Sequence, residues 1–532
     1  MLFNFLLSPW SILLIIPLAL VYFTLPYLQN KPLRNIPGPP LAGLSNLWLL
    51  YQSRQGRRFM KVDAAHKKYG PLVRIQPNHV SIADPAAIQT VYGHGNGFLK
   101  SEFYDAFVSI KRGLFNTRDR AEHTRKRKTV SHTFSAKSVG QFEQYMHQNL
   151  ELFVQRLDTM ANHAPIGGYT DLDALHWFNY LAFDIIGDLA FGAPFGMLEK
   201  GKDIAEVRMT PDAKPTFAPA IEVLNRRGEV SATVGCLPAM KPYAKYLPDA
   251  FFSKGIAAVE NLAGIAVARV NDRLERPDTD RVDLLARLME GRDEKGQPLG
   301  RQELTAEALT QLIAGSDTTS NTSCAILYHC LTHPEVIVKA REELDKAWPA
   351  EQRVPTFSQV KDLPYLDALI KESLRIHSTS SLGLPRDVPP QGITVTLSPS
   401  ASSDPSNPSN QPTSVYFPGG TTLSVPSYTI HHSQKVWGPD ADEYRPERWL
   451  ADSANPAPIE AQKNAFVPFS YGPRSCVGRN VAEMELALIV ATVLRSWDWE
   501  LRQGEMETRE GFLRKPLGLE VGIRMRGAGG KS

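Results

Sequence analysis

The sequence predicts a mainly α-helical protein with a small β region, built as a single large domain behind an N-terminal transmembrane helix. Three observations lead to this prediction. The first 30 residues carry no charged side chain, apolar residues then recur at helical spacing through most of the chain, and strand patterns are confined to short runs. The length of 532 residues would by itself favour two or more domains.

The membrane anchor is predicted over residues 1–30, because about 20 apolar residues are enough to span a bilayer as a helix. Lys31 and Arg34 follow directly, and no Lys or Arg precedes them, which places the following domain on the cytoplasmic side. A cleaved signal peptide is the alternative. It needs a basic start, a shorter apolar run and a small-residue cleavage site, and none of these is evident.

A stiff hinge follows at residues 31–40, because the run from Ile36 to Pro40 contains three prolines that restrict the backbone. The globular domain then covers residues 41–532. Its first expected elements are two short strands, Leu72–Ile75 and His79–Ala83, separated by a turn.

Helices dominate the chain from about Ala121 to Val388. Apolar residues recur there at intervals of three and four, most regularly over Asp171–Gly192, Leu304–Thr332 and Leu366–His377. Asp317 and several hydroxyl residues interrupt the second of these patterns, so we expect an interrupted helix there.

The region Thr394–Pro418 has a different composition. Residues 398–412 are rich in Ser and Pro and poor in apolar side chains, which predicts a disordered surface insertion. A strand pattern resumes at Thr422–Pro426. One more long helix is expected to begin near Cys476, and short strands end the chain.

Composition excludes some classes of protein. A net charge of +3, with charges of both signs mixed along the helices, does not suggest nucleic-acid binding. The four cysteines form no CxxC pair and show no spacing typical of a disulfide framework, which fits a reducing compartment. They are Cys236, Cys324, Cys330 and Cys476.

Cys476 lies in a loop between Gly472 and Gly478, close to Arg474 and just before a predicted helix. A cysteine at a helix N-terminus beside an arginine has a lowered pKa, so we expect a thiolate. Glycines let backbone N–H groups approach the sulfur, as a soft, anionic metal ligand requires. A structural cysteine or a nucleophile is the alternative, although no histidine base lies nearby in the sequence.

The pattern Phe469-x-x-Gly-x-Arg474-x-Cys476-x-Gly478 resembles the haem-binding signature of the cytochrome P-450 superfamily. The resemblance covers nearly the whole chain. It implies the cytochrome P-450 fold, a haem cofactor contacted by Phe469 and Gly478, and Cys476 as the axial thiolate ligand of the iron, which favours O–O cleavage. Because distant motifs must surround one cofactor, it also favours one domain over two.

A second motif, Ala314–Thr319, resembles the oxygen-activating helix of this superfamily. A glycine followed by an acid and a hydroxyl is unfavourable inside a helix. The resemblance implies that Thr318 assists oxygen activation and that Asp317 relays protons. A satisfied polar patch is the alternative.

A third motif pairs Glu372 with Arg375, which lie three residues apart on one helix face. Such pairs are common in any helix. In the superfamily the pair joins a downstream arginine, here Arg448, and the resemblance implies a structural role in holding the cysteine loop.

A fourth motif places His123 and Arg127 on one helix face. The superfamily usually has tryptophan in place of the histidine, but an imidazole also donates a hydrogen bond. The resemblance implies that this pair, together with Arg386 and Arg474, binds the haem propionates, since arginine can bind carboxylates through two parallel hydrogen bonds.

Arg125, Lys126 and Lys128 occupy the other faces of the same helix. They are either a solvated face or a basic patch that steers an acidic electron donor. The membrane-bound members of the superfamily use O2 and take electrons from an NADPH-dependent flavoprotein reductase. The resemblance therefore implies that partner, and a location at the endoplasmic reticulum membrane.

Four longer blocks resemble the fungal benzoate 4-monooxygenase group within this superfamily, which converts the small aromatic acid benzoate to 4-hydroxybenzoate. The insertion at residues 398–412 is not expected in that group. The blocks are Val91–Lys100, Arg112–Arg120, Ala182–Gly187 and Gly511–Gly518.

By family position, the substrate would lie among aromatic, helical and loop residues, and its carboxylate would need a polar partner. The expected walls are Phe103, Tyr104, Phe107, Leu312–Thr318, Ser378–Leu384 and Leu517, and the candidate carboxylate partners are Ser378–Ser381, Lys100, Lys111 and Arg112.

Three alternatives stay open: a monooxygenase with another aromatic or fatty substrate, a haem-binding protein without oxygenation, and a reductase-independent haem enzyme. The intact pair of Asp317 and Thr318 argues against the last two, because a carrier has no need to deliver protons to bound oxygen.

Overall fold

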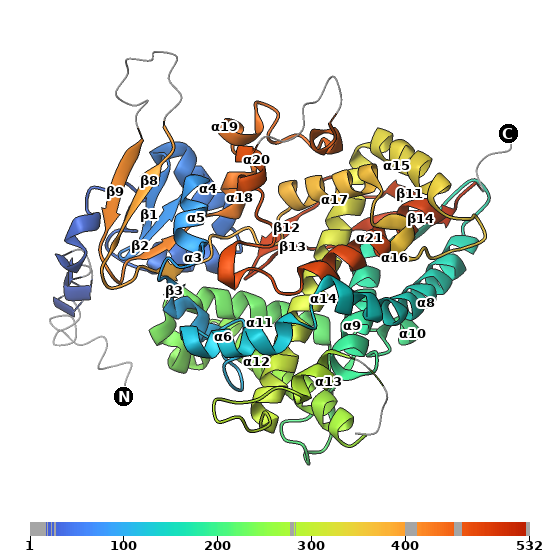
Figure 1. Cartoon of the computed structure of the whole chain (residues 1–532), viewed down its shortest axis with the longest axis horizontal. Coiled ribbons are helices and arrows are strands. Elements are labelled where there is room, and N and C mark those ends of the chain that lie inside the picture. Colours follow the sequence, from blue (N-terminus) through green and yellow to red (C-terminus); the bar gives the residue numbers. More distant parts are fainter. Residues whose placement is uncertain are drawn as a thin grey trace.

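The computed structural model describes residues 17–18, 20–22, 24–25, 28–276, 281, 283–399, 412–451 and 460–527. A β-rich part lies on one side, and helices with a few further short strands among them make up the rest of the molecule (Figure 1), so the prediction of a mainly α protein with a small β region is confirmed. Most of the predicted anchor, and most of the predicted insertion at residues 398–412, lie outside the described residues.

The described helices differ widely in length, and the longest of them is α14. In chain order they are η1 Lys31–Leu33, α3 Leu47–Arg54, α4 Arg58–Tyr69, α5 Ala86–Tyr92, η2 Glu102–Phe107, α6 Arg120–Ser131, α7 Ala136–Val139, η3 Gly140–Phe142, α8 Glu143–Asn162, α9 Ala174–Phe191, α10 Met197–Lys200, α11 Ala220–Gly235, η4 Pro238–Tyr246, α12 Ala250–Leu274, α13 Leu284–Met289, α14 Arg301–Thr332, α15 Pro334–Ala347, α16 Phe357–Val360, α17 Pro364–Ile376, α18 Ser427–His431, α19 Gln434–Trp437, η6 Pro446–Trp449, α20 Glu460–Ala465, η7 Gly472–Arg474 and α21 Arg479–Ser496.

The strands are short and form one larger sheet with several small ones. They are β1 Leu72–Gln76, β2 His79–Ile82, β3 Leu99–Lys100, β4 Thr170–Asp173, β5 Ala205–Val207, β6 Thr216–Ala218, β7 Arg386–Asp387, β8 Ile393–Leu397, β9 Thr413–Phe417, β10 Thr422–Ser424, β11 Trp497–Leu501, β12 Thr508–Glu510, β13 Arg514–Pro516 and β14 Glu520–Met525.

The larger sheet joins the two ends of the chain in the order β1-β2-β10-β7-β3. The predicted strands β1 and β2 pair antiparallel, and the predicted strand β10 adds to β2 in parallel, with Leu423 opposite Val80. On its other side, Leu423 lies opposite Arg386 of β7. The sheet therefore brings Arg386 into a fixed register with strands from the first hundred residues.

Strands border the predicted insertion on both sides. β8 and β9 pair antiparallel from Ile393–Phe417 to Leu397–Thr413. Their alternating side chains, with Val395 and Leu397 buried, pack one face of this hairpin onto the sheet region. Both strands lie outside residues 398–412, so the surface insertion between them stays a prediction.

The predicted helix at Asp171 begins later than expected. Residues 170–173 form β4, which pairs with β14, and α9 starts at Ala174 after the Asp173 side chain accepts a hydrogen bond from the Leu175 N–H at 2.9 Å. The other end was predicted well, since Gly192 has φ of 80° and ends the helix.

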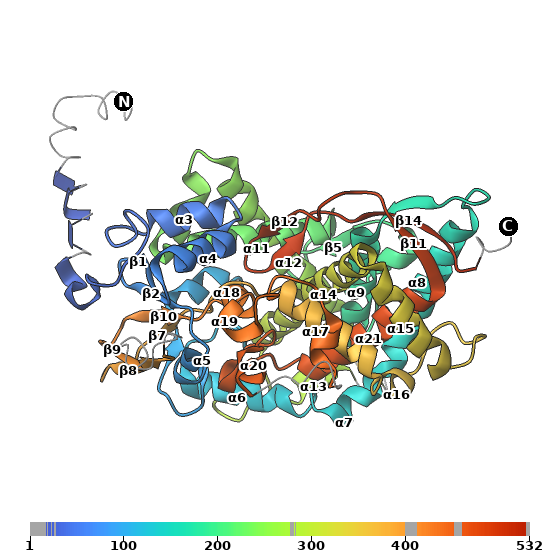
Figure 2. The same ribbon diagram turned by 90° about the horizontal axis from the view of Figure 1, so that it is seen from above.

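The long helix α14 runs through the middle of the molecule in both views (Figures 1 and 2) and is continuous from Arg301 to Thr332. The predicted interruption at Asp317 is therefore wrong. The hydroxyls of Ser316 and Thr318 donate to the carbonyls four residues earlier, both at 2.7 Å, so the helix absorbs its polar residues without breaking.

Among the described residues, one helix is long and apolar enough to cross a membrane, α12. It packs against α11 and α14 with residues such as Leu262 and Ile265 fully buried, which is the arrangement of a core helix. It therefore gives no support to a second span.

A buried ion-pair cluster attaches the segment before the cysteine loop to α17. Arg375 donates to both carboxylate oxygens of Glu372, at 2.9 and 2.7 Å, and both side chains are fully buried. Arg448 approaches the same carboxylate at 3.4 Å, and the Trp449 indole donates to it at 2.9 Å. Arg375 also donates to the carbonyl of His431 at 2.7 Å. The carboxylate therefore binds donors from two separate segments, α17 and the residues around η6.

Replacing Glu372 with Gln should lower the free energy of unfolding by about 3–5 kcal/mol, because Arg375 and Arg448 would remain buried without an opposite charge. Denaturant titration of the purified protein measures this loss. The matched control is Asp367→Asn on the same helix, where an exposed pair with Lys371 is worth about 0.5 kcal/mol or less. Equal losses in the two variants would contradict the role of the cluster.

Candidate active site

The cysteine loop is held in place by backbone contacts on both sides of Cys476. The Cys476 N–H donates to the Phe469 carbonyl at 2.9 Å, and Gly478 is the N-cap of α21. Gly472 has φ of 72°, and a Cβ there would lie 1.9 Å from the Tyr92 carbonyl oxygen, so this glycine allows the loop to pack against the end of α5. The loop thus presents the thiol at the N-terminal end of α21.

Cys476 differs from the other three cysteines, all of which the structure describes: it is exposed and they are buried. Desolvation by the surrounding protein nevertheless raises the pKa of its thiol, and this effect outweighs the Gly478 N–H and Arg127, which lower it. The polypeptide alone therefore does not lower this pKa as expected, and the predicted thiolate depends on a bound metal ion. A coordinating metal ion deprotonates a thiol outright. The Cys476 side chain is accessible to solvent and yet surrounded by protein, so it faces an internal space.

Positively charged groups from three separate segments gather near this loop. Arg127 of α6 donates to the Ser475 carbonyl at 2.7 Å, and Arg474 donates to the Thr117 carbonyl at 2.7 Å. Arg386 of β7 is buried and donates to the Tyr104 hydroxyl at 2.9 Å. The first two contacts tie the loop to α6 and to the segment before it.

His123 is buried on the same face of α6, and its ring has no hydrogen-bond partner among the residues that the structure describes. Burial, together with the charges of Arg474, Lys100, Arg127 and Arg386, lowers the pKa of His123 to about 2. The imidazole is therefore neutral at neutral pH and can donate one hydrogen bond.

Lys100 belongs to the same cluster. Burial, followed by the charges of Arg386, Arg474 and Arg127, lowers the pKa of Lys100 well below its ordinary value. Cations that oppose one another's charge in a buried region favour an anion between them. The cluster thus contains the predicted propionate-binding residues His123, Arg127, Arg386 and Arg474. It also contains Lys100, a predicted candidate partner of the substrate carboxylate.

These features fit a haem with an axial thiolate. The uncovered Cys476 offers a soft ligand, and the cationic cluster offers donors for two carboxylates. Ala314, in the middle of the otherwise buried α14, is also exposed, so the helix and the thiol both border open space.

The oxygen-helix motif is divided between two environments. Thr318 is partly exposed and lines a cavity, whereas Asp317 is buried and burial raises the pKa of its carboxyl. The glycine at position 315 is explained by helix packing. A Cβ there would lie 2.6 Å from the Ile186 side chain of α9, so the glycine lets α9 and α14 pack closely. Neighbouring Thr319 donates to the buried Glu485 of α21 at 3.1 Å, and burial raises the pKa of Glu485 to about 8.

The cavity beside Thr318 has a volume of about 130 Å3 and is mainly apolar. Three rings close it, those of Phe107, Phe115 and Phe512, with centroids 5.6, 5.2 and 5.0 Å apart in edge-to-face pairs. Its walls include Ile110, Leu309, Ile313, Ala314, Leu513 and Arg227.

Only part of the predicted substrate wall lines this cavity. The predicted wall residues that line it are Phe107, Ile313, Ala314 and Thr318, and the candidate carboxylate partner Lys111 also lines it. Leu517 is 56% exposed, and residues 378–381 do not border the cavity. Sequence reasoning missed Phe115, Phe512, Leu513 and Arg227. Phe115 lies inside the block Arg112–Arg120, and Phe512 and Leu513 lie inside Gly511–Gly518, so the resemblance pointed to the blocks without identifying these residues.

A larger cavity of about 360 Å3 lies elsewhere, lined by polar residues such as Arg58, His79 and Ser424. Neither Cys476 nor Thr318 borders it. We therefore place the candidate active site at the smaller, apolar cavity.

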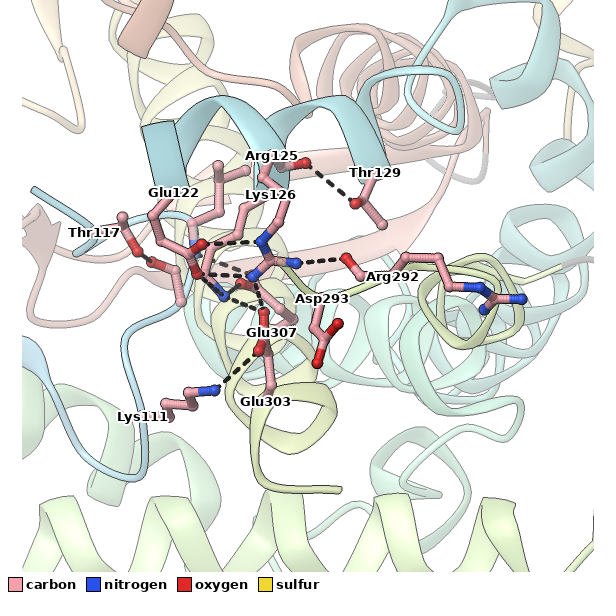
Figure 3. A network of polar contacts seen from close by, with 12 residues as sticks. Lys111, Thr117, Glu122, Arg125, Lys126, Thr129, Arg292, Asp293, Glu303 and Glu307 are labelled. Carbon is pink, nitrogen blue, oxygen red and sulfur yellow. Dashed lines mark hydrogen bonds and ion pairs between the residues drawn. The ribbon is translucent and has the colours of Figure 1, made fainter. Parts of the chain in front are cut away.

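The basic residues of α6 are not a free patch. Figure 3 shows Arg125 and Lys126 turned toward Glu303 and Glu307 of α14. Lys126 is buried and lies 2.6 Å from Glu303 and 3.0 Å from Glu307. The interpretation of Arg125 and Lys126 as a basic patch that attracts an electron donor is wrong, because both side chains form ion pairs with glutamates inside the fold. Lys128 remains exposed.

Comparison with known proteins places these observations in context. The sequence model of the family Cytochrome P450 matches residues 37–396 and 406–523. The chain is 64% identical to Benzoate 4-monooxygenase bphA of Aspergillus niger over 531 residues, covering 98% of this chain and 99% of that protein. It is 33% identical to a cytochrome P450 monooxygenase of Aspergillus terreus over 491 residues, covering 88% and 90% of the two chains.

The contact between α6 and α14 makes stability depend on pH. Burial alone would raise the pKa of Glu303, but hydrogen bonds from Lys126, Arg125 and Lys111 lower it from 4.5 to about 2. Because the folded protein holds this pKa below its unfolded value, the stabilisation is complete above pH 4.5 and is lost as the pH falls through about 2.

Replacing Glu303 with Gln should therefore lower the free energy of unfolding by about 3 kcal/mol at neutral pH. The difference from the wild type should shrink as the pH falls below 4.5. Denaturant titrations at several pH values measure both effects. Glu122→Gln, at the more exposed edge of the network, is the control and should lose about 1 kcal/mol or less. A pH-independent loss in Glu303→Gln would refute the ion-pair explanation.

Proposed function

The chain belongs to the cytochrome P450 family and is a haem-dependent monooxygenase, and we propose that it hydroxylates benzoate to 4-hydroxybenzoate, with Cys476 as the axial ligand. The observation that carries the choice of substrate is the small cavity beside Thr318, closed by three phenylalanine rings. The 64% identity to the Aspergillus niger protein supports the same substrate. A cavity this small disfavours a long fatty chain.

The haem-holding residues in this proposal act from three sides. Cys476 supplies the thiolate, flanked by Phe469 and Gly478. His123 and Arg127 from α6, Arg386 from β7 and Arg474 from the cysteine loop bind the two propionates, and their mutual repulsion without an anion supports this assignment. The cluster of Glu372, Arg375 and Arg448 acts structurally, by holding the segment before the loop.

A haem held by Cys476 would supply the activation of O2, because thiolate ligation favours O–O cleavage. Each turnover consumes O2, two electrons and two protons, and one oxygen atom leaves as water. The cavity must therefore admit protons on one side and exclude bulk water on the other. Phe107, Phe115 and Phe512 perform the second task by packing around the substrate ring.

Asp317 and Thr318 perform the first task. Burial raises the pKa of Asp317, so its carboxyl can hold a proton closer to neutral pH than an exposed aspartate. The Thr318 hydroxyl, next in the chain, borders the cavity. Lys515 interacts with Asp317 and lies 3.8 Å from Glu229, which in turn lies 3.2 Å from the partly exposed Arg509. Lys515 and Glu229 thus lie between Asp317 and the surface, where they can exchange protons with solvent, and Arg509 holds the Glu229 carboxylate.

The electrons come from a redox partner, and an NADPH-dependent flavoprotein reductase is the partner we propose. Residues 1–30 form a single-pass anchor in the same proposal, with the catalytic domain on the cytoplasmic side of the endoplasmic reticulum membrane. The support is the uncharged stretch followed by Lys31 and Arg34.

Titration of the ferric protein with benzoate tests the substrate. We expect a saturable shift of the haem absorption from low to high spin, and 4-hydroxybenzoate as the product in the presence of O2, NADPH and a reductase. The control is Cys476→Ala, which should lose the absorption typical of a thiolate-bound haem with carbon monoxide. Absence of the shift in wild-type protein with intact thiolate absorption would refute benzoate as the substrate.

Deleting residues 1–30 tests the anchor. We expect the shortened protein to move from the membrane fraction to the soluble fraction after alkaline extraction, because the apolar segment that inserts into the bilayer has been removed. It should keep the benzoate-induced spectral shift of the full chain. A shortened protein that stays in the membrane after extraction would show that another surface holds it there.

A further inference from the structure

Arg227 is a buried cation that the mechanism above does not use. It lies in α11, is 6% exposed, and has no acidic partner among the described residues. Its guanidinium donates to the Phe107 carbonyl at 3.0 Å and lies 5.5 Å from the Phe107 ring, while its Nε has no hydrogen-bond partner. Burial lowers the pKa of Arg227 to about 10, so the side chain is still charged at neutral pH.

A buried charge without an opposite charge is unfavourable, since desolvation is not offset by pairing. Among the other buried arginines, Arg375 is paired with Glu372 and Arg58 with Glu510. Arg386 is also buried without an acidic partner among the described residues, but it belongs to the cationic cluster beside the cysteine loop. Arg227 lies outside that cluster, so its missing partner is informative. Its side chain lines the same cavity as Thr318 and Phe512, where a ligand can provide the missing anion.

The other cations near the cavity already have partners. Lys111, which also lines the cavity, lies 3.0 Å from Glu303. Arg112 lies 2.7 Å from Asp105. Lys100 donates to the Phe115 carbonyl and belongs to the cationic cluster of Arg386 and Arg474.

The hydroxyl groups that the sequence pointed to are satisfied in a similar way. Ser381 donates to the Ser378 carbonyl at 2.5 Å, and Thr379 pairs with Thr322 at 3.1 Å. Ser378, Thr379 and Ser381 do not line the cavity.

We propose that Arg227 binds the carboxylate of the substrate and so determines both the preference for an aromatic acid and the position of hydroxylation. This inference rests on the proposed function and assigns the recognition of that substrate to one side chain. The guanidinium fork suits a carboxylate, and its unpartnered Nε adds a donor. With the carboxylate held at α11, the opposite end of the ring is free to point toward Ala314 and Thr318 on α14, which is the orientation that para attack requires.

Spectral titration of Arg227→Gln with two matched ligands, benzoate and the uncharged benzamide, tests this role. Wild-type protein should bind benzoate far more tightly than benzamide. The variant should bind benzoate roughly 30-fold or more weakly, because one partner of a buried ion pair has been removed, and should bind benzamide with little change. Arg227→Lys should recover part of the benzoate affinity.

The control is Arg226→Gln, the same substitution one residue earlier. Arg226 is largely exposed and pairs with Glu222 at 2.8 Å, so its loss should change neither affinity. The thiolate absorption of the reduced carbon monoxide complex confirms in each variant that the haem site is intact. If Arg227→Gln fails to fold, Arg227→Lys decides the test through its ratio of benzoate to benzamide affinity.

The outcomes separate the two proposals. Benzoate binding of wild-type strength in Arg227→Gln, or an equal loss for benzoate and benzamide, overturns the role of Arg227 and leaves benzoate as the substrate. A wild-type protein that does not bind benzoate overturns both the proposed substrate and the role of Arg227. A selective loss of benzoate supports both.

Discussion

The close packing of α14 is the constraint on which the rest of the site depends. Gly315 lets Ile186 of α9 approach one face of this helix, and Thr319 bonds to Glu485 of α21 on another. The N-terminal turns carry Glu303 and Glu307, which pair with α6. What remains is the stretch around Ala314 and Thr318, which is the part that borders the cavity. One helix therefore sets the positions of α6, of the helix α21 that follows Cys476, and of one wall of the cavity.

Charge is distributed over these elements according to its task. Lys126 on one face of α6 is paired with two glutamates and contributes to stability. Among the described residues, Arg127 and His123, on the face toward the cysteine loop, have no carboxylate beside them, and neither has Arg227 in α11. A buried cation without a carboxylate is unfavourable, which supports the proposals that anionic ligands bind beside Arg127 and beside Arg227.

This distribution also bears on electron transfer. Since Arg125 and Lys126 form ion pairs inside the fold, they are not free to contact a redox partner. Lys128 and Arg479 are exposed, and Arg479 forms a surface pair with Glu483. Surface pairs of this kind are weak and can exchange partners.

The sequence by itself determined the helical class, the strands β1, β2 and β10, the cysteine loop and the pairing of Glu372 with Arg375, because each rests on local periodicity or on a short motif. It placed the haem-site residues by resemblance alone. The tertiary structure decided that α14 is unbroken and that burial raises the pKa of Cys476. It also decided that Lys126 pairs with Glu303, 177 positions away in the sequence, and that Arg227 lines the cavity without an acidic partner among the described residues. Burial and long-range pairing depend on which elements pack together, and a local pattern does not contain that information.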